Sequence, residues 1–266
     1  MTLIVCDVDG TLVDSQKQLS DGNRAAIERA RAAGIGFTII SARPRSGLMW
    51  IAEALDLDAP MGAFNGGIVF RRDGSIAEHH TIAPEVARGM FDLIGDAPVD
   101  RWVFADDRWY ASSGEGTHVD HERRASNQAP VVTNDIDDLL DHADKITFVS
   151  DDAPLLAGLH QRAAVRFGDA ATVVQSQTYY LDVTAKAANK GDGIAALAKA
   201  MHVDLGKTVA IGDQGNDIAM FVRAGRAIAM GNATDAAKAA AGMVTRSNDA
   251  DGVAYAIDTM ILKEPA

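Results

Sequence analysis

The sequence predicts an α/β fold, with a doubly wound parallel sheet as the core and a smaller α+β domain inserted into it. Two observations carry this prediction. Short apolar runs alternate with segments of helical length at both ends of the chain, which is typical of a parallel sheet with helices on its two faces. Between these ends lies a stretch of roughly a hundred residues with hairpin signals and isolated helices, which is a plausible size for a small domain.

The N-terminal part of the core begins with Leu3–Cys6, a short and continuous apolar run that predicts a central strand covered on both faces. Residues 14–17 are predicted to form a polar loop. A helix follows from about 21 to 33, with Ser20 or Asp21 as its cap and Gly34 at its end, and then a second strand over 36–40. A helix with Pro44 in its first turn, running to about residue 55, and a short strand over 61–64 complete the alternation. Apolar runs on either side of Asp73-Gly74 then predict a hairpin. The resulting fold is Rossmann-like.

The pattern of predicted elements changes near residue 82, where hairpins and isolated helices replace the alternation of strands and helices. The alternation resumes near Lys190, which is predicted to begin a helix. An apolar strand over 208–211 then runs into a second acidic segment. We therefore predict an α/β core domain made of residues 1–81 and 186–266, interrupted by an inserted α+β cap domain over residues 82–185.

Composition limits the possible partners and compartments. The chain has 266 residues, 47% of them hydrophobic, and a formal net charge of -12, whereas nucleic acids call for a basic face. A phosphorylated small molecule stays possible, because a metal ion and one lysine can reverse the field locally. The single cysteine, Cys6, excludes an intrachain disulfide, and no apolar run approaches membrane-spanning length. We expect a cytoplasmic protein, and the sequence leaves monomer and homodimer both open.

Two aspartates follow the first predicted strand directly. The period-2 alternation of a strand places Asp7 and Asp9 on the same side, with Val8 pointing the other way. Two carboxylates this close repel each other unless a cation lies between them, so the pair suits a magnesium ion and a nucleophilic carboxylate. A lone pair of this kind is ordinarily a solvated turn. The buried strand before it and Gly10-Thr11 after it weaken that interpretation.

Further polar residues occupy comparable places. Ser41 and Asp213 follow predicted strands, Asp217 lies four residues further on, and Lys190 opens a helix. The carboxyl ends of parallel strands share one edge of a sheet, and ligands bind in the crevice there. Taken singly, these residues have structural explanations: a strand-end serine, a solvated lysine, and carboxylates that cap a helix. Their order and their placement together favour a shared site.

The motifs resemble those of the haloacid-dehalogenase-like (HAD) phosphohydrolases. Ser41 resembles the second motif and Lys190 the third, while the first and fourth are Asp7-Val8-Asp9-Gly10-Thr11 and Gly212-Asp213-Gln214-Gly215-Asn216-Asp217. The position of the insertion is similar to that of a type II (C2) cap in this family. Its pattern of predicted helices and strands resembles the Cof-like subgroup. Ala42 departs from the pattern, because many relatives carry glycine there. Alanine at position 42 leaves the hydroxyl group of Ser41 available for its expected role, but it allows fewer backbone conformations than glycine would.

The chemistry and the resemblance together imply roles for these residues. Asp7 would attack phosphorus and form an aspartyl-phosphate, while Asp9 would act as general acid and then general base. Lys190 would neutralise charge on Asp7 and on the phosphoryl group. Ser41 would bind a phosphoryl oxygen alongside nearby backbone N–H groups. The other residues expected at the substrate are Ala42, Arg43, Asn65, Gly66 and Asn216.

The expected metal is Mg²⁺, held by Asp7, Asp213 and the main-chain carbonyl of Asp9, with Asp217 acting through water or orienting Lys190. Asn216 could serve either the metal or the phosphate. The expected function is a Mg²⁺-dependent phosphatase for a small phosphorylated metabolite, such as a sugar phosphate. A phosphomutase of the phosphomannomutase type and a non-catalytic sensor of a phosphorylated ligand are the alternatives. Cap loops near 112–116 and 177–180 would set specificity.

Overall fold

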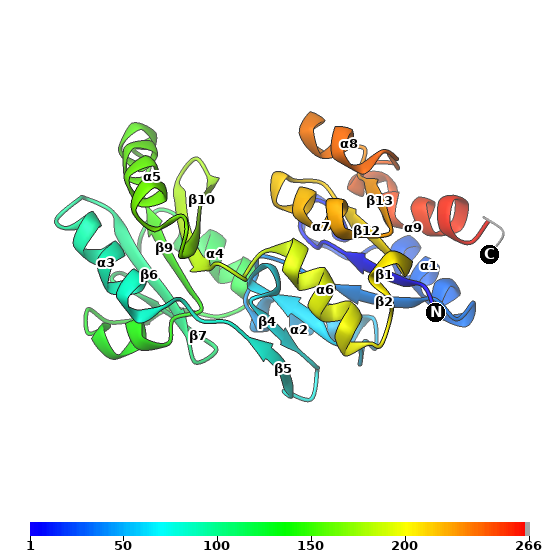
Figure 1. The fold of residues 1–266 in the computed structure, drawn as a ribbon, viewed down its shortest axis with the longest axis horizontal. Coiled ribbons are helices and arrows are strands. Elements are labelled where there is room, and N and C mark those ends of the chain that lie inside the picture. The colour runs from blue at the N-terminus through cyan, green and yellow to red at the C-terminus, as the bar shows by residue number, and fades with distance from the viewer. Residues whose placement is uncertain (264–266) are drawn as a thin grey trace. The chain divides into compact units, whose positions relative to one another are not determined.

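The computed structural model describes residues 1–263, which form two compact units (Figure 1). The first unit contains residues 1–42, 49–78 and the chain from 189 onward, and the second contains residues 43–48 and 79–188. The contacts thus group residues 43–48, 79–81 and 186–188 with the second unit. The predicted domain boundaries, at 81/82 and 185/186, stay a prediction.

The first unit is built on a parallel sheet in the order β13-β12-β1-β2. Its strands are Leu3–Cys6 (β1), Gly36–Ile39 (β2), Thr208–Gly212 (β12) and Arg226–Ala229 (β13). All four residues of β1 are fully buried, as expected for a central strand covered on both faces. The chain leaves β1 towards β2, whereas β12 and β13 lie on its other side. The direction of winding therefore changes between β1 and β12, which is where sheets of this kind bind ligands.

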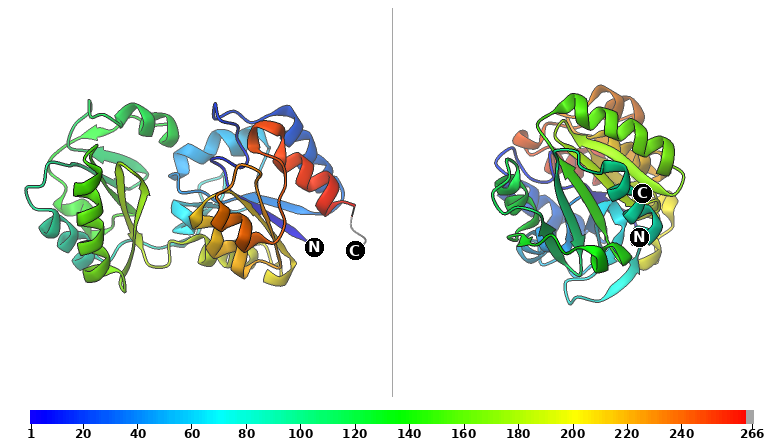
Figure 2. Two further views of the ribbon diagram at one scale, coloured as in Figure 1. Left: turned by 90° about the horizontal axis from the view of Figure 1, so that it is seen from above. Right: turned by 90° about the vertical axis from the view of Figure 1, so that its left-hand side faces the viewer.

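Helices cover both faces of this sheet. Figure 2 shows α1 together with α9 on one face, and α6 together with α7 on the other. The helices of this unit, with α2 shared between the units, are Asp21–Ala32 (α1), Arg45–Ala54 (α2), Lys190–Ala200 (α6), Ile218–Arg223 (α7), Asp235–Ala241 (α8) and Gly252–Ala256 (α9). Ser20 caps α1 by accepting the Asn23 N–H, as its predicted start required. The predicted α/β class with a parallel sheet and covering helices is confirmed.

The third predicted strand pairs mainly with a strand that simple alternation does not predict. Strands Met61–Ala63 (β3), Ile68–Phe70 (β4) and Ile76–His79 (β5) form a separate three-stranded sheet, in which β3 and β4 pair antiparallel. A single parallel bridge, Ile40 to Gly62, joins β3 to the end of β2. The hairpin signal at Asp73-Gly74 is correct, because these residues turn the chain between β4 and β5.

The second unit contains a six-stranded sheet in the order β10-β11-β9-β6-β7-β8. All its pairs are antiparallel except β7 with β8. The elements are Pro84–Ile94 (α3), Asp100–Ala105 (β6), Arg108–Ala111 (β7), Val119–Ser126 (α4), Val131–Val132 (β8), Lys145–Val149 (β9), Ala153–Phe167 (α5), Ala171–Gln177 (β10) and Tyr180–Ala185 (β11). Apolar residues of α3, α5, β6, β9 and β11 share one core, so this α+β unit has a hydrophobic interior of its own.

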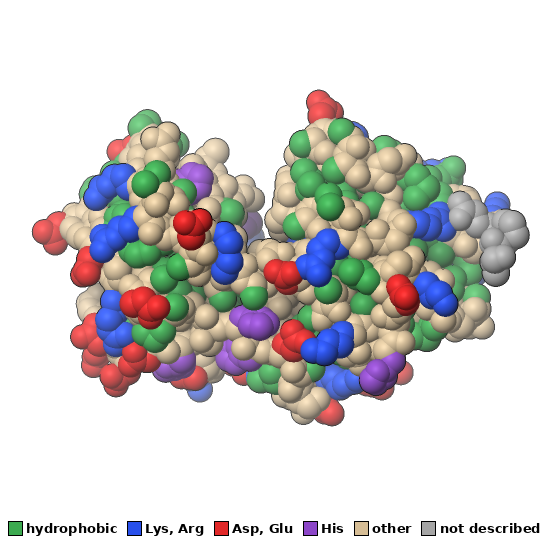
Figure 3. All heavy atoms as spheres, viewed as in Figure 1, with side chains coloured by type: hydrophobic (Ala, Val, Ile, Leu, Met, Phe, Trp, Pro, Cys, Tyr) green, Lys and Arg blue, Asp and Glu red, His purple; other side chains and the backbone are tan. Residues whose placement is uncertain are grey.

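The distribution of charged side chains and the apolar character of the helices can be compared with the expectations from composition. On the face in Figure 3, Lys and Arg side chains are interspersed with Asp and Glu. Within residues 1–263, no helix has both the length and the apolar character that crossing a bilayer requires.

Candidate active site

Two neighbouring strands deliver the first two carboxylates. β1 and β12 pair in register, with Cys6 opposite Ile211, and the N–H of Asp7 donates to the carbonyl of Ile211 at 2.8 Å. Asp7 is thereby held at the end of β1, while Asp213 follows directly after β12. Both residues are buried, at 5% and 2% exposure. Parallel pairing across the switch point thus brings together two residues that are about 200 positions apart in sequence.

Lys190 connects Asp7 to Asp217. It is the first residue of α6, whose N-cap Asn189 accepts the N–H of Asp192 at 2.9 Å. Its ammonium nitrogen, Nζ, lies 2.5 Å from Oδ1 of Asp7 and 2.6 Å from Oδ1 of Asp217. All three side chains are buried. A buried lysine between two buried carboxylates is costly to desolvate, and it persists only when its partners are this well placed.

Asp217 also organises the turn that carries Asp213. Its second oxygen, Oδ2, accepts the N–H of Asp213 at 2.7 Å and that of Gln214 at 2.8 Å. Together with Lys190, this gives the two oxygens of Asp217 three hydrogen bonds. Asp217 therefore contacts both the lysine and the turn after β12. Whether it acts in the reaction through water or by orienting Lys190 stays a prediction.

The carboxylates form a group that fits a metal ion. Asp7, Asp213 and Asp217 each place one oxygen within 4.8 Å of the others. Three buried carboxylates face one buried lysine, so the site carries excess negative charge that a hard divalent cation would balance. Mg²⁺ prefers oxygen ligands of this kind. Because Asp217 is already engaged by three donors, Asp7 and Asp213 are the better candidates for direct ligands.

The pKa shifts reflect the same competition between burial and charge. Burial raises the pKa of Asp7 well above its ordinary value, with Lys190 opposing the rise and the other two carboxylates adding to it. Burial likewise raises the pKa of Asp213. Burial alone would lower the pKa of Lys190, but the charges of Asp217 and Asp7 raise it instead. A cation at this group would favour the ionised carboxylates.

Gly10 lets the loop after β1 pass close to Asp213. Its backbone has a positive φ of +77°, and a Cβ added there would lie 2.4 Å from Oδ2 of Asp213. The hydroxyl of Thr11, the next residue, donates to Oδ1 of Asp213 at 3.0 Å. The first motif therefore positions a residue of the fourth motif by close approach as well as by a hydrogen bond.

Three of the residues expected at the substrate lie in one connected arrangement. The buried Ser41 receives the N–H of Asn65 at its carbonyl, at 2.7 Å. The side-chain amide of Asn216 donates to Oδ1 of Asn65 at 3.2 Å. Asn65 adopts a left-handed conformation, with φ of +59°, which asparagine tolerates better than most residues. Segments from β2, β3 and β12 thus supply neighbouring polar groups, and substrate contact stays a prediction for each.

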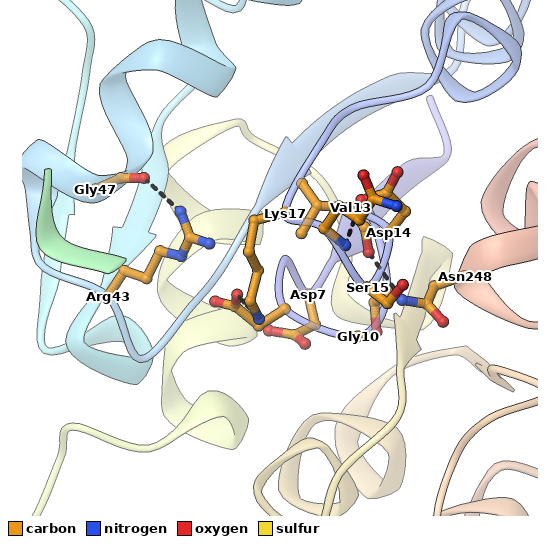
Figure 4. Close-up of polar contacts among 12 residues, drawn as sticks. Asp7, Gly10, Val13, Asp14, Ser15, Lys17, Arg43, Gly47 and Asn248 are labelled. Carbon is orange, nitrogen blue, oxygen red and sulfur yellow. Dashed lines mark hydrogen bonds and ion pairs between the residues drawn. The ribbon is translucent and has the colours of Figure 1, made fainter. Parts of the chain in front are cut away.

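The remaining expected substrate residues have local surroundings of their own. A Cβ at Gly66 would lie 2.5 Å from the Cα of Gly193, so this glycine permits close packing against α6. Ala42 is exposed. Arg43 is buried and donates from Nη1 to the carbonyl of Gly47 at 3.1 Å, within the first turn of α2 (Figure 4). The structure thus gives Gly66 and Arg43 packing and hydrogen-bonding roles, and their contact with substrate remains a prediction.

Asp9 has a partner that the sequence reasoning missed. Nζ of Lys17 lies 2.7 Å from Oδ1 of Asp9, and Figure 4 shows the Lys17 side chain reaching back from the loop. Asp9 does not belong to the carboxylate group that surrounds the candidate metal position. Only its main-chain carbonyl was expected as a ligand, and the acid–base role expected for its side chain stays a prediction. The only available signal was a lysine in the polar loop that follows the first motif.

Comparisons with known proteins agree with the motifs. The family model for haloacid dehalogenase-like hydrolases matches residues 4–257. The phosphatase YwpJ of Bacillus subtilis is 26% identical over 283 residues, covering 96% of this chain and 98% of that protein. The 5-amino-6-(5-phospho-D-ribitylamino)uracil phosphatase YwtE of the same organism is 27% identical over 285 residues, covering 98% of each.

Solved structures are similar over nearly the whole chain as well. The crystal structure of a haloacid dehalogenase-like hydrolase from Bacteroides thetaiotaomicron has a TM-score of 0.87 and 27% identity, covering 97% of this chain and 99% of that one. A haloacid dehalogenase-like hydrolase from B. subtilis has a TM-score of 0.85 and 26% identity, covering 98% and 100%. This chain belongs to the haloacid dehalogenase-like hydrolase family, as its four motifs predicted.

Proposed function

We propose that the protein is a Mg²⁺-dependent phosphatase that hydrolyses a small phosphorylated metabolite through an aspartyl-phosphate on Asp7. That the chain is a hydrolase of the phosphatase kind follows from its family and from the names of its relatives. The observation that carries the mechanistic proposal is the buried contact of Lys190 with both Asp7 and Asp217, beside Asp213 at the switch point of the sheet.

In the proposed first step, a carboxylate oxygen of Asp7 forms a bond to phosphorus while the bond from phosphorus to the leaving oxygen breaks. Asp9 gives a proton to that leaving oxygen. Lys190 is already in contact with Asp7, so its charge is in place before the phosphoryl group arrives. A preorganised charge of this kind needs little rearrangement during the reaction.

In the second step, Asp9 takes a proton from a water molecule, whose oxygen bonds to phosphorus as the bond to Asp7 breaks. Phosphate leaves, and both aspartates return to their starting states. When bound, Mg²⁺ would neutralise charge on the phosphoryl oxygens and on Asp7. Asp7, Asp213 and the Asp9 carbonyl would hold it, and Asp217 would keep Asp213 and Lys190 in position. Ser41, Asn65 and Asn216 would supply hydrogen bonds to the phosphoryl group or its carrier.

Charge and the names of the relatives support the substrate class that we propose. The net charge of -12 disfavours a nucleic acid, and a local cation with Lys190 suits a small phosphate ester. One relative is named for a phosphorylated ribitylaminouracil, which is a small metabolite with a polyol chain. We therefore propose that the substrate of this protein is a phosphorylated polyol or sugar. We also propose that the protein acts in the cytoplasm.

The test is release of inorganic phosphate from a panel of sugar phosphates, the ribitylaminouracil phosphate and an aryl phosphate. Each compound is assayed with Mg²⁺, with a chelator, and with Asp7→Asn and Asp213→Asn. The exposed Asp96 lies outside the site, so Asp96→Asn is a control that removes the same charge. We expect release that needs Mg²⁺ and Asp7 and is unaffected in the control. A folded, Mg²⁺-loaded protein that releases phosphate from none of these compounds would contradict the proposal.

A further inference from the structure

We propose that Lys17 is a positioning residue that holds the carboxylate of Asp9 for proton transfer, an inference that rests on the acid–base role proposed above for Asp9. In this arrangement Nζ of Lys17 holds Oδ1 of Asp9 and so fixes the orientation of its carboxyl group. Four observations on the described residues support this role.

The first observation is how polar partners are distributed among the carboxylates. Lys190 contacts Asp7 and Asp217, at 2.5 and 2.6 Å. Asp213 instead receives the hydroxyl of Thr11 and the side-chain amide of Gln214, at 3.0 and 2.9 Å. Asp9 is contacted by a different lysine, because Nζ of Lys17 lies 2.7 Å from its Oδ1. Asp9 thus has a cation separate from the one that serves the nucleophile and Asp217.

The second observation is the shape of the loop that presents Lys17. The carboxylate of Asp14 accepts the N–H groups of Gln16 and Gln18, each at 2.8 Å. The N–H of Lys17 donates to the carbonyl of Asp14 at 3.0 Å, and Lys17 itself has a φ of +63°. A left-handed backbone is unfavourable for a residue with a long side chain. The tight turn around Asp14 holds this conformation and returns the lysine toward Asp9.

The third observation is that the C-terminal part of the chain anchors this loop. The side-chain amide of Asn248 donates to the carbonyl of Val13 at 3.0 Å, and Figure 4 shows these residues in contact. Asp249 accepts the N–H of Ser15 at 2.8 Å. At the start of the loop, Asn232 donates to the carbonyl of Gly10, also at 2.8 Å. These attachments restrict the backbone that carries Lys17.

The fourth observation concerns stability. The side chains of Lys17 and Asp9 are 49% and 35% exposed. Ion pairs this exposed contribute little to folding, because water screens them and ordering the lysine costs entropy. A strained residue on an anchored loop is therefore poorly explained by stability. It is explained by orientation, because proton transfer requires a carboxyl group within hydrogen-bond reach of the leaving oxygen.

The kinetic test compares Lys17→Met and Lys17→Arg with wild type, on the best alkyl phosphate of the panel. Misplacing a reacting group by about 1 Å can cost about 10²-fold, so we expect Lys17→Met to lower kcat by about 10- to 100-fold with little change in KM. Arginine keeps the charge and should restore most of the rate. Lys207 is exposed and outside the site, so Lys207→Met is the matched control and should leave kcat unchanged.

The double variant shows whether Lys17 acts through Asp9. If it does, adding Lys17→Met to Asp9→Asn should change kcat by less than about twofold, because the group being positioned is already disabled. An undiminished effect in the Asp9→Asn background would overturn the proposal, and so would an unchanged kcat in Lys17→Met.

Crystal structures of wild type and Lys17→Met give a readout that does not depend on activity. We expect the Asp9 carboxylate to turn away from its wild-type orientation, or to become mobile, when the lysine is removed. An unchanged and ordered Asp9 would overturn the positioning role. A wild-type protein that hydrolyses nothing would contradict the proposed phosphatase instead, so the two failures are distinguishable.

Discussion

Lys190 shows how one residue can serve both stability and chemistry. It is buried, and it lies between Asp7 and Asp217, which are buried as well. Each of the three charges would be costly without the others. The same arrangement places a positive charge beside the proposed nucleophile before substrate binds. The residue thus links the fold of α6 to the chemistry at the end of β1.

Replacing this lysine should therefore affect both properties. We expect Lys190→Met to lower kcat by about 10²–10³-fold, because a preorganised charge is lost. Without metal, the variant should also lose about 3–5 kcal/mol of unfolding free energy, because two buried carboxylates lose their cation. Urea unfolding in chelator and steady-state kinetics with Mg²⁺ measure the two effects.

The same helix offers a matched control. Lys199 lies near the end of α6 and pairs with Glu78 at 3.2 Å, with 81% of its side chain exposed. An exposed pair contributes little, so Lys199→Met should change neither quantity appreciably. Equal effects of the two substitutions would contradict the role assigned to Lys190.

At the scale of elements, the loop after β1 depends on close approach between segments. Gly10 has a positive φ and lies against the Asp213 carboxylate, so Gly10→Ala combines backbone strain with a direct clash. We expect the variant to lose Mg²⁺-dependent activity, because Asp213 must move. The backbone strain alone should cost about 1–2 kcal/mol of stability.

Gly74 separates these two causes. It has a φ of +87° in the turn before β5, and a Cβ added there would meet nothing within 4 Å. Gly74→Ala should therefore show the strain without the loss of activity. Full activity in Gly10→Ala, measured by phosphate release, would contradict the close approach described here.

The sequence predicted those elements whose signals are local. The apolar run of β1, the cap of α1 and the turn at Asp73-Gly74 each produced the expected structure. Strand pairing was harder to predict from the sequence. β3 pairs antiparallel with β4 and contacts β2 through one bridge, and such pairing depends on the three-dimensional arrangement of the strands and not on local sequence. The two-residue strand Val131–Val132 has no periodicity long enough to detect.

The candidate site shows the same limit. Strand-end placement was enough to suggest that Asp7, Lys190, Asp213 and Asp217 would converge, and the structure brings them together. Lys17 was treated as part of a polar loop, because its contact with Asp9 depends on a left-handed backbone and on anchors from residues 232–249. Nothing in the local sequence reveals such long-range contacts. Gly66 likewise has a packing role against Gly193 that only the fold shows.

For the whole molecule, a bound cation should couple to folding. If Mg²⁺ binds the native carboxylates and not the unfolded chain, it stabilises the protein by about 2.7 kcal/mol at 100 times its dissociation constant. We expect the melting temperature to rise with Mg²⁺ in wild type and not in Asp213→Asn. Differential scanning calorimetry at several Mg²⁺ concentrations measures this, and identical shifts in both proteins would contradict the assigned site.

The pH dependence of this shift has a defined sign. Burial raises the native pKa values of Asp7 and Asp213 above their unfolded values, so without metal the folded state favours their protonated forms. The metal-free protein loses that contribution as pH rises through the native pKa values. Mg²⁺ needs the ionised forms, so its stabilising effect should be larger at pH 7.5 than at pH 5. A larger shift at the lower pH would contradict this linkage.

The most direct measurement of the central claim is chemical trapping of the covalent intermediate. An aryl phosphate is mixed with enzyme and Mg²⁺, the reaction is quenched in acid during turnover, and borohydride converts any acyl phosphate to an alcohol. Peptide mass spectrometry then locates the change. We predict homoserine at position 7 in wild type, more of it in Asp9→Asn if the second step slows most, and none without Mg²⁺. Active turnover with an unmodified Asp7 at every quench time would contradict the proposed mechanism.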